Sequence, residues 1–157
     1  MPLVGFLPPS DPRIRATVLA IADELTENGL VLRYRVGEVD EEVSGEEGTF
    51  AIASFWLVSA LVEIGEAERA RTLCERVLSL ASPLGLYAEE LDPVTGRHLG
   101  NFPQAFTHLA LIDSVLRVIH DGEPAAHVGQ LHARRRLRHT DDRASRTQLT
   151  IVGKRIT

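Results

Sequence analysis

Two adjacent carboxylates, Glu89 and Glu90, lie in the segment "LYAEELDPVTGRHLGNFPQAF", between two strongly apolar stretches. The segment is rich in Gly, Pro and Asn, which favour turns and loops. A carboxylate held in a defined turn can act as a general acid or base. Most loop carboxylates are only solvated, so from the residues alone both interpretations of Glu89 and Glu90 stay open.

The segment with Glu89 and Glu90 is the second of two polar loops; the first follows the short apolar piece "LVLRYR" and carries Arg33, Tyr34 and an acidic run that ends at Glu47. Charged groups bind sugar hydroxyls firmly and fix their directions. Carboxylate pairs also cleave glycosidic bonds, one donating a proton while the other activates water or attacks. If the two loops meet, a sugar site is predicted from both. The second loop would add Tyr87, Glu89, Glu90, Asp92, Arg97, His98 and Asn101.

Several of these residues have simpler explanations. "DPVTG" (92–96) has the composition of a turn. His98 and His108 lack a second His or a Cys at ligand spacing, so no metal site is expected. The acidic residues between 38 and 47 do not follow the pattern of a calcium loop and read mostly as a solvated loop. There is no glycine-rich phosphate loop, and no cofactor is expected.

The apolar periodicity predicts four helices. "SDPRIRATVLAIADELTENGL" has Asp11 as the N-cap, Pro12 at the first helical position and Gly29 just past the end. "TFAIASFWLVSALVEIG" is apolar on nearly every side and predicts a helix buried all round, with Phe55 and Trp56 in the core or, alternatively, as a wall of the sugar pocket. "EAERARTLCERVLSLAS" is amphipathic and places Cys74 on its apolar face as an inert thiol. The last helix begins at Pro103 and is again mostly apolar, so it too is expected to be buried.

The order of these segments repeats. Gly29-Leu30 and Gly85-Leu86 are in register 56 residues apart, each after an amphipathic helix and before a polar loop and an apolar helix. Such units stack into arrays because one unit cannot bury its own apolar face. The pattern predicts an all-α fold of two α-hairpins, an arc of an α/α toroid whose two polar loops share one rim. An open arc leaves apolar helix faces uncovered, which favours a homo-oligomer.

Composition separates the chain into two parts. The 157 residues are 44% hydrophobic and carry a net charge of −5, which argues against nucleic acid as a main partner. Residues 1–119 hold 9 basic and 18 acidic side chains, whereas 120–157 hold 8 basic and 4 acidic ones with no aromatics. We expect 1–119 to be the folded domain and 120–157 to be a mostly disordered basic tail. Its "RRRLRH" run is expected to be solvated.

The amino-acid composition also predicts the cellular location of the protein. With Cys74 as the single cysteine, no internal disulfide is possible, which favours a reducing, cytoplasmic location. No apolar run reaches the roughly 18 residues of a membrane span, so no membrane association is expected. The opening "MPLVGFLPPSDP" has no basic region before its apolar stretch and does not resemble a signal peptide.

Three segments together closely resemble the C-terminal part of glycoside hydrolase family 15, the glucoamylases and bacterial trehalases. They are "PLVGFLPPSDPR", "EEGTFAIASFWLVSAL" and "AEELDPVTGRHLGNFPQAFTHLAL", in the family's order and spacing across roughly residues 2–119. The resemblance implies an incomplete (α/α)6 toroid and the inverting hydrolysis of an α-glucosidic bond, with an α-glucoside or oligosaccharide as the substrate. In that mechanism an acid and a base stand about 6.5–9.5 Å apart, with water between them.

The resemblance also implies roles for particular residues. The family's catalytic base is the first acid of the motif written here as "AEELDP", which carries over to Glu89, with Glu90 beside it. Its sugar-binding "RY" pair falls on Arg33 and Tyr34, and a substrate-contact loop falls near Glu47. The family's general acid lies upstream of these residues. The chain is therefore expected to be a fragment that is inactive alone and needs an N-terminal half. The alternative is a non-catalytic α-helical repeat that serves as an interaction module.

Overall fold

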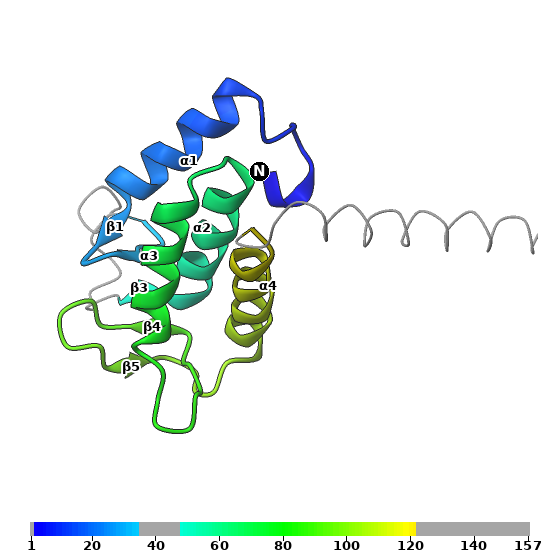
Figure 1. Ribbon diagram of the computed structural model, residues 1–157. Coiled ribbons are helices and arrows are strands. Elements are labelled where there is room, and N and C mark those ends of the chain that lie inside the picture. Colours follow the sequence, from blue (N-terminus) through cyan, green and yellow to red (C-terminus); the bar gives the residue numbers. More distant parts are fainter. Residues whose placement is uncertain (1, 35–47, 122–157) are drawn as a thin grey trace, which may run out of the picture. The chain divides into compact units, whose positions relative to one another are not determined.

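The computed structural model describes residues 2–34 and 48–121. Four α-helices follow one another, as the sequence predicted, after a 3₁₀ turn, η1 (Pro2–Val4). They are α1 (Pro12–Glu24), α2 (Ala51–Glu63), α3 (Ala67–Leu78) and α4 (Ala105–Asp121) (Figure 1). The predictions about the tail from residue 120 onward and about Glu47 concern residues outside these ranges, apart from the end of α4.

Helix α1 begins as predicted. The Asp11 carboxylate accepts a hydrogen bond from the Arg13 backbone N–H at 2.9 Å, and Pro12 occupies the first turn. The Arg13 side chain pairs with the same carboxylate and lowers the pKa of Asp11 to about 2. Ile14 and Val18 are buried on the apolar stripe of the helix.

The expected end of this helix at Gly29 is wrong. Helix α1 ends at Glu24, and a hairpin of β1 (Thr26–Glu27) and β2 (Leu30–Val31) follows. Asn28 and Gly29 form its two-residue turn, with φ of 48° and 79°. An Asn-Gly pair is the preferred sequence for a turn that needs two positive φ angles. Gly29 is therefore explained by the hairpin and not by the helix end.

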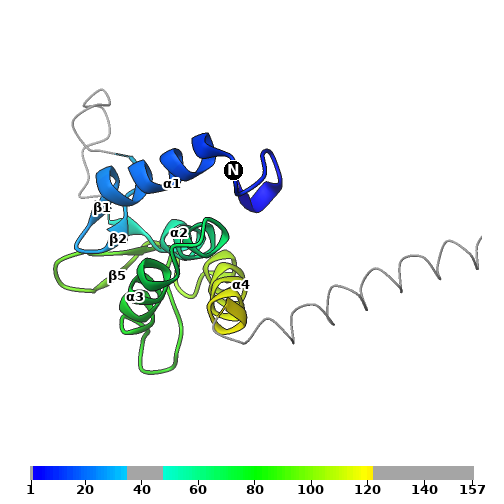
Figure 2. The same ribbon diagram turned by 45° about the horizontal axis from the view of Figure 1, so that its top comes forward.

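Helix α2 lies at the centre, packed against α3 and α4, with α1 crossing beside it (Figure 2). Phe55 is completely buried, as predicted, but Trp56 is 50% exposed. The prediction of a helix buried all round is therefore wrong at Trp56, because no described element covers that side. Helix α3 is amphipathic as predicted, and its buried face consists of Ala70, Leu73, Cys74 and Val77.

Helix α4 differs most from its prediction. It begins at Ala105 rather than Pro103, and its buried residues are Thr107, Ala110 and Ser114. The expectation that α4 is buried is wrong, because α2 and α3 contact it and the opposite side faces outward. Large apolar side chains on that side are about half exposed or more: Phe106, Leu109, Ile112, Leu116 and Ile119.

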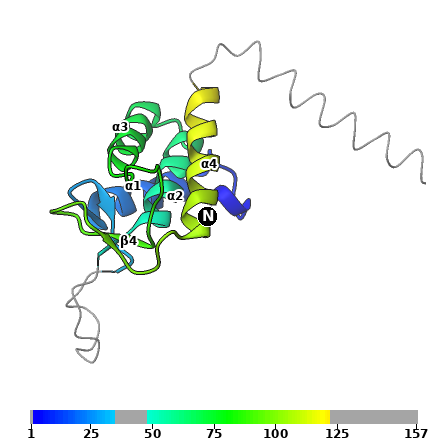
Figure 3. The same ribbon diagram turned by 90° about the horizontal axis from the view of Figure 1, so that it is seen from below.

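Short strands join the two polar loops. β3 (Thr49–Phe50), β4 (Glu90–Leu91) and β5 (His98–Leu99) form an antiparallel sheet in the order β3-β4-β5 (Figure 1), and β4 is labelled again in the view of Figure 3. Phe50 is opposite Glu90, which in turn is opposite Leu99. The described ends of the first loop, at Arg33 and at Thr49–Phe50, lie beside the second loop, in agreement with the repeat. The fold is thus mostly helical with two small sheets rather than purely α-helical, and within residues 2–34 and 48–121 no helix is suited to crossing a membrane.

Candidate functional site

The backbone of Glu89 is fixed on both sides. Its N–H donates to the Asn101 carbonyl at 2.9 Å, and its carbonyl accepts the Ala51 N–H at 3.0 Å. Leu91, two residues later, is completely buried and pairs with Thr49 across the sheet. Because the backbone is held on both sides and anchored in the core, the Glu89 side chain is directed to the surface from a rigid position.

Arg33 connects the first loop to both carboxylates. Its Nη2 donates to Glu90 Oε1 at 2.9 Å and lies 3.6 Å from Glu89 Oε1. The guanidinium also lies over the Phe50 ring, 4.3 Å from its centre, in a cation–π contact. The Arg33 side chain is 40% exposed, and pairs exposed in this way contribute about 1 kcal/mol or less to stability. The contacts of Arg33 with Glu89, Glu90 and Phe50 therefore fix the positions of these charged groups and contribute little to the stability of the fold.

The second oxygen of Glu89 is held by a different residue. The Asn101 side-chain amide donates to Glu89 Oε2 at 2.9 Å, and the Asn101 backbone N–H is 3.4 Å from the same atom. Gly100 precedes it with φ of 70°, and a Cβ there would stand 3.1 Å from Glu89 Oε2. The close approach of this loop to the carboxylate therefore depends on a glycine.

Glu90 is the more enclosed of the two acids. Its side chain is 18% exposed, against 26% for Glu89. Besides Arg33, it accepts the Gly48 N–H at Oε2, at 3.3 Å. With both oxygens engaged by the protein, Glu90 is suited to holding Arg33, whereas the contact of Arg33 with Glu89 Oε1 is longer, at 3.6 Å.

The first loop is attached to the core close to Arg33. Leu30 and Val31 are buried in β2, and the Val31 N–H donates to Ser54 Oγ of α2 at 2.9 Å. Tyr34 follows Arg33 and is half-buried. These contacts explain how a residue 57 positions away in sequence reaches Glu90.

The start of α4 holds the chain just before Glu89. The Tyr87 N–H donates to His108 Nε2 at 3.3 Å, and the Tyr87 carbonyl accepts the Gln104 N–H at 2.9 Å. The Thr107 hydroxyl donates to the Ala88 carbonyl at 3.2 Å. His108 Nδ1 faces the Gln104 carbonyl at 2.7 Å, so the neutral ring with its proton on Nδ1 satisfies both contacts.

Other residues of the second loop have structural partners. Asp92 Oδ1 accepts the N–H groups of Thr95 and Val94, and these bonds lower the pKa of its carboxyl. His98 Nε2 lies 2.9 Å from the Leu80 carbonyl. The turn interpretation of "DPVTG" is thus confirmed. Of the residues grouped as a sugar site, hydrogen bonds and ion pairs join Arg33, Glu89, Glu90 and Asn101.

Metal binding has no support in the described part of the chain, where no three His, Cys, Asp or Glu side chains gather as a ligand set. Cys74 is buried, and burial raises the pKa of its thiol, with a further contribution from Glu75. Such a thiol stays protonated and unreactive.

Phe50, Gly48 and Gly100 were not among the sequence-predicted site residues. Phe50 carries the cation–π contact, and no local pattern distinguishes it from a core aromatic. Gly100 could have been found, because "LGNF" places a glycine directly before a polar residue of the site. The arrangement as a whole offers a fixed, half-buried carboxylate beside a cation, which can accept a proton from water and bind hydroxyl groups.

Comparison with known proteins identifies the family of the chain. The sequence profile described as Glycosyl hydrolases family 15 matches residues 1–116. A trehalase of Mycolicibacterium smegmatis is 75% identical over 123 residues, which is 78% of this chain and 18% of that protein. A trehalase of Mycobacterium tuberculosis is 74% identical over 123 residues, which again is 78% of this chain and 18% of that protein. A trehalase of Thermoplasma acidophilum is 42% identical over 113 residues, 71% of this chain and 19% of that protein.

The chain thus spans about a fifth of the length of these curated relatives. No solved structure matches it. The matched residues include α1 to α3, most of α4, and Arg33, Glu89, Glu90 and Asn101. The chain belongs to glycosyl hydrolase family 15.

Proposed function

We propose that this chain forms the part of a family 15 catalytic toroid that carries the general base of an inverting α-glucoside hydrolase acting on trehalose. The observation that carries the proposal is the cluster of Arg33 and Asn101 around Glu89, within the region matched to the family. The trehalase names of the relatives at 74–75% identity support trehalose over other α-glucosides.

Glu89 takes the role of base. A water molecule beside Oε1 gives its proton to Glu89 while its oxygen bonds to the anomeric carbon. The bond from that carbon to the leaving oxygen breaks, and the general acid protonates that oxygen. Asn101 holds Oε2, so Oε1 is the oxygen directed to the water. Arg33 donates to substrate hydroxyls, and Glu90 fixes the guanidinium in place.

Tyr34 and Glu47 complete the proposed substrate contacts. Tyr34 follows Arg33 in the family's "RY" pair and is half-buried beside it. Glu47 belongs to the loop before α2 and lies outside the described residues. The family resemblance implies a general acid upstream of this region. We therefore propose that the chain hydrolyses trehalose only when another polypeptide segment supplies that acid.

The test uses the chain produced together with the part of the M. smegmatis trehalase that it does not match, which we call the complemented protein. We expect glucose from trehalose with the complemented protein and none with the chain alone. An inverting enzyme releases one β-glucose and one α-glucose from each trehalose, which NMR resolves before mutarotation. Release of α-glucose alone would mean retention and would rule out this role for Glu89. No hydrolysis at all, beside a stable complex, would favour the non-catalytic interaction module.

We also propose that the protein is cytoplasmic. Its support is the single cysteine, Cys74, which is buried and has no partner cysteine. Fractionation of cells that express the chain would test the proposal, and enrichment in the extracellular fraction would contradict it.

A further inference from the structure

We propose that His108 of α4 is a positioning residue for Glu89, and that it has this role only while its Nε2 atom carries no proton. The imidazole contacts the backbone two residues before the proposed base. The inference rests on the proposed function, because it assigns to the base a residue that holds it in place. Its first test needs no catalysis, and its second separates the role of His108 from that of Glu89.

His108 binds the Tyr87 N–H through one particular tautomer. Its Nε2 accepts the Tyr87 backbone N–H at 3.3 Å, and its Nδ1 lies 2.7 Å from the Gln104 carbonyl oxygen. A carbonyl can only accept, so Nδ1 carries the proton and Nε2 provides the lone pair. A protonated imidazole has two N–H donors and no acceptor. Protonation therefore places an N–H of the ring against the Tyr87 N–H and removes this contact.

Tyr87 is held too firmly to turn its N–H toward water. The residue is 1% exposed, and its hydroxyl donates to the Val77 carbonyl at 3.1 Å. Its ring makes T-shaped contacts with Phe55, at 5.5 Å between ring centres, and with His108, at 6.0 Å. A buried N–H without a partner is unfavourable. Loss of the His108 acceptor therefore favours movement of the backbone at Tyr87.

Such movement reaches Glu89 through bonded neighbours. The Gln104 N–H donates to the Tyr87 carbonyl at 2.9 Å, and the Thr107 hydroxyl donates to the Ala88 carbonyl at 3.2 Å. Glu89 follows directly in the chain. Of the contacts that the start of α4 makes with this backbone, the one to the imidazole is the one that protonation abolishes, because an amide N–H and a hydroxyl do not titrate in this range.

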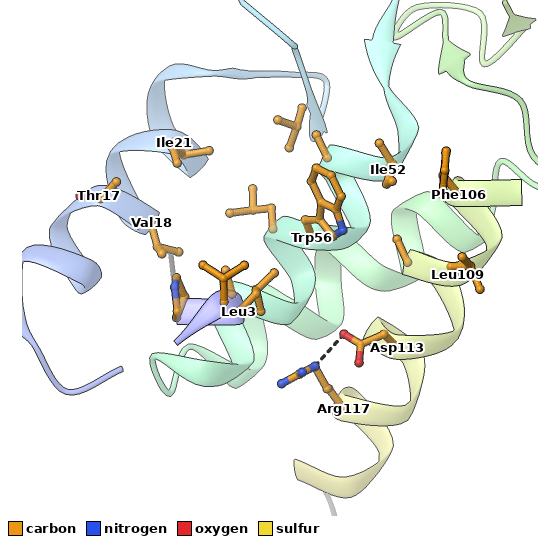
Figure 4. A pocket seen from close by; sticks show the side chains of 17 residues that line it. Leu3, Thr17, Val18, Ile21, Ile52, Trp56, Phe106, Leu109, Asp113 and Arg117 are labelled. Carbon is orange, nitrogen blue, oxygen red and sulfur yellow. Dashed lines mark hydrogen bonds and ion pairs between the residues drawn. The ribbon is translucent and has the colours of Figure 1, made fainter. Parts of the chain in front are cut away.

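His108 lies on a different side of α4 from the residues before and after it. Phe106 and Leu109 line the groove between α1, α2 and α4 together with Trp56 of α2 (Figure 4), and His108 is not among the residues that line it. Its half-buried ring contacts Tyr87 of the second loop. A substitution at position 108 therefore changes the loop contact and leaves the apolar lining of the groove in place.

No ion pair compensates a proton on His108 in residues 2–34 and 48–121. One turn away along α4 there is no charged residue. The titratable groups around His108 and Tyr87 are Tyr87 itself, His98 of β5, whose ring stacks on Tyr87 at 6.2 Å, and Cys74 of α3. Burial raises the pKa of Tyr87 to about 12, so its phenol stays neutral while a histidine titrates.

Two amide variants separate the roles of the two ring nitrogens. In His108→Gln the side-chain oxygen reaches the place of Nε2 and can accept the Tyr87 N–H. In His108→Asn the amide reaches only the place of Nδ1, beside the Gln104 carbonyl. The two variants are matched in polarity, and neither carries a charge. His120→Gln, at an exposed position of the same helix, is the control for the loss of a histidine.

Amide hydrogen exchange in the chain alone, resolved by NMR, tests the contact itself. After correction for the intrinsic effect of pH, we expect protection of the Tyr87 amide to fall about tenfold in His108→Asn and to persist in His108→Gln. In the native chain it should fall between pH 7.5 and 5, where histidine gains a proton, while the buried Val58 amide of α2 stays protected. Equal protection of Tyr87 in the native chain and His108→Asn overturns the proposal.

The arm that varies the pH needs no variant, so it decides even where a substitution prevents folding. Protection of Tyr87 that is the same at pH 7.5 and 5 in the native chain also overturns the proposal.

Kinetics of the complemented protein test the consequence for the base. We expect kcat for trehalose to fall by about tenfold or more in His108→Asn with little change in KM, and to stay near the native value in His108→Gln and His120→Gln. As the pH falls from 7.5 to 5, kcat should decline further in the native chain than in His108→Gln, because only the native side chain gains a proton.

The two roles fail in different ways. Equal losses of kcat in His108→Asn and His108→Gln, with the same course over pH, would make His108 a packing residue and overturn the proposal. Unchanged kcat in His108→Asn, with the native protein active, would overturn the role of His108 and leave Glu89 as the base. No glucose from the native complemented protein would overturn the proposed function, and the role of His108 with it.

Discussion

The side-chain amide of Asn101 donates to Glu89 Oε2 at 2.9 Å, while Glu89 Oε1 lies 3.6 Å from Arg33 Nη2. The two oxygens of one carboxylate therefore have different surroundings. One is fixed by the loop that follows β5, and the other faces the cation from the first loop. This asymmetry directs a single oxygen of Glu89 toward a reacting water in the proposed mechanism.

Asn101→Ala tests whether that hydrogen bond orients the base. Losing a hydrogen bond to a charged group costs about 1.5–3 kcal/mol. In the complemented protein we expect kcat for trehalose to fall by about tenfold or more, with little change in KM, because in the proposed mechanism Asn101 orients Glu89 and does not bind the sugar. Steady-state kinetics would measure both constants. A rise in KM at constant kcat would instead make Asn101 a sugar ligand.

Gly100→Ala tests the close approach of the loop to Glu89. Gly5 has a matching φ of 67° against 70° for Gly100, but a Cβ at Gly5 has no atom within 4 Å. The same substitution at Gly5 therefore reports the backbone cost alone, about 1 kcal/mol. We expect Gly100→Ala to lower the free energy of unfolding by more than Gly5→Ala, measured by urea denaturation of the chain. Equal losses would mean that Glu89 moves aside without cost.

Tyr87→Phe tests the support beneath Glu89. The Tyr87 hydroxyl donates to the carbonyls of Val77 and Leu78 at the end of α3, at 3.1 and 3.2 Å. Its loss leaves buried carbonyl groups with fewer donors and should cost about 1–2 kcal/mol of unfolding free energy at neutral pH. Urea denaturation of both proteins measures this difference.

The same residue predicts a dependence on alkaline pH. Burial, with a smaller electrostatic contribution from Cys74, raises the pKa of Tyr87 to about 12, above the ordinary value of about 10. The stability contributed by the protonated phenol is therefore complete below pH ~10 and is lost as the pH rises toward 12. Between pH 9 and 11 the free energy of unfolding of the native chain should fall by about 1 kcal/mol more than that of Tyr87→Phe. Parallel losses in the two proteins would contradict this pKa.

The helices could be predicted because their signals are local. Asp11 and Pro12 specify the start of α1 through contacts within one turn, and the apolar spacing of Ala70, Cys74 and Val77 specifies the buried face of α3. The hairpin after α1 was missed although Asn28-Gly29 indicates it. The sequence pattern instead placed Gly29 just past the end of the helix, because glycine also favours that position.

Burial of α4 could not be predicted from its composition. A helix that is apolar on many sides is stable in water when other elements cover those sides, but the sequence does not say which chain segment does so. Leu109 and Trp56 are exposed for this reason and not because the helix assignments were wrong. The site was predicted in part: the repeat brought the two loops together, and Arg33 does reach Glu90. The position of Phe50 beneath Arg33 depends on the register of β3 with β4, which no local pattern fixes.

The most direct measurement is the rate of glucose release from trehalose by the complemented protein, compared between the native chain, Glu89→Gln and Glu75→Gln. Glu75 is an exposed carboxylate on α3 and serves as the matched control. A general base contributes about 10²–10⁴-fold, so Glu89→Gln should lose activity by that factor while Glu75→Gln keeps it. Full activity in Glu89→Gln, with the native chain active, would contradict the assignment of Glu89 as the base.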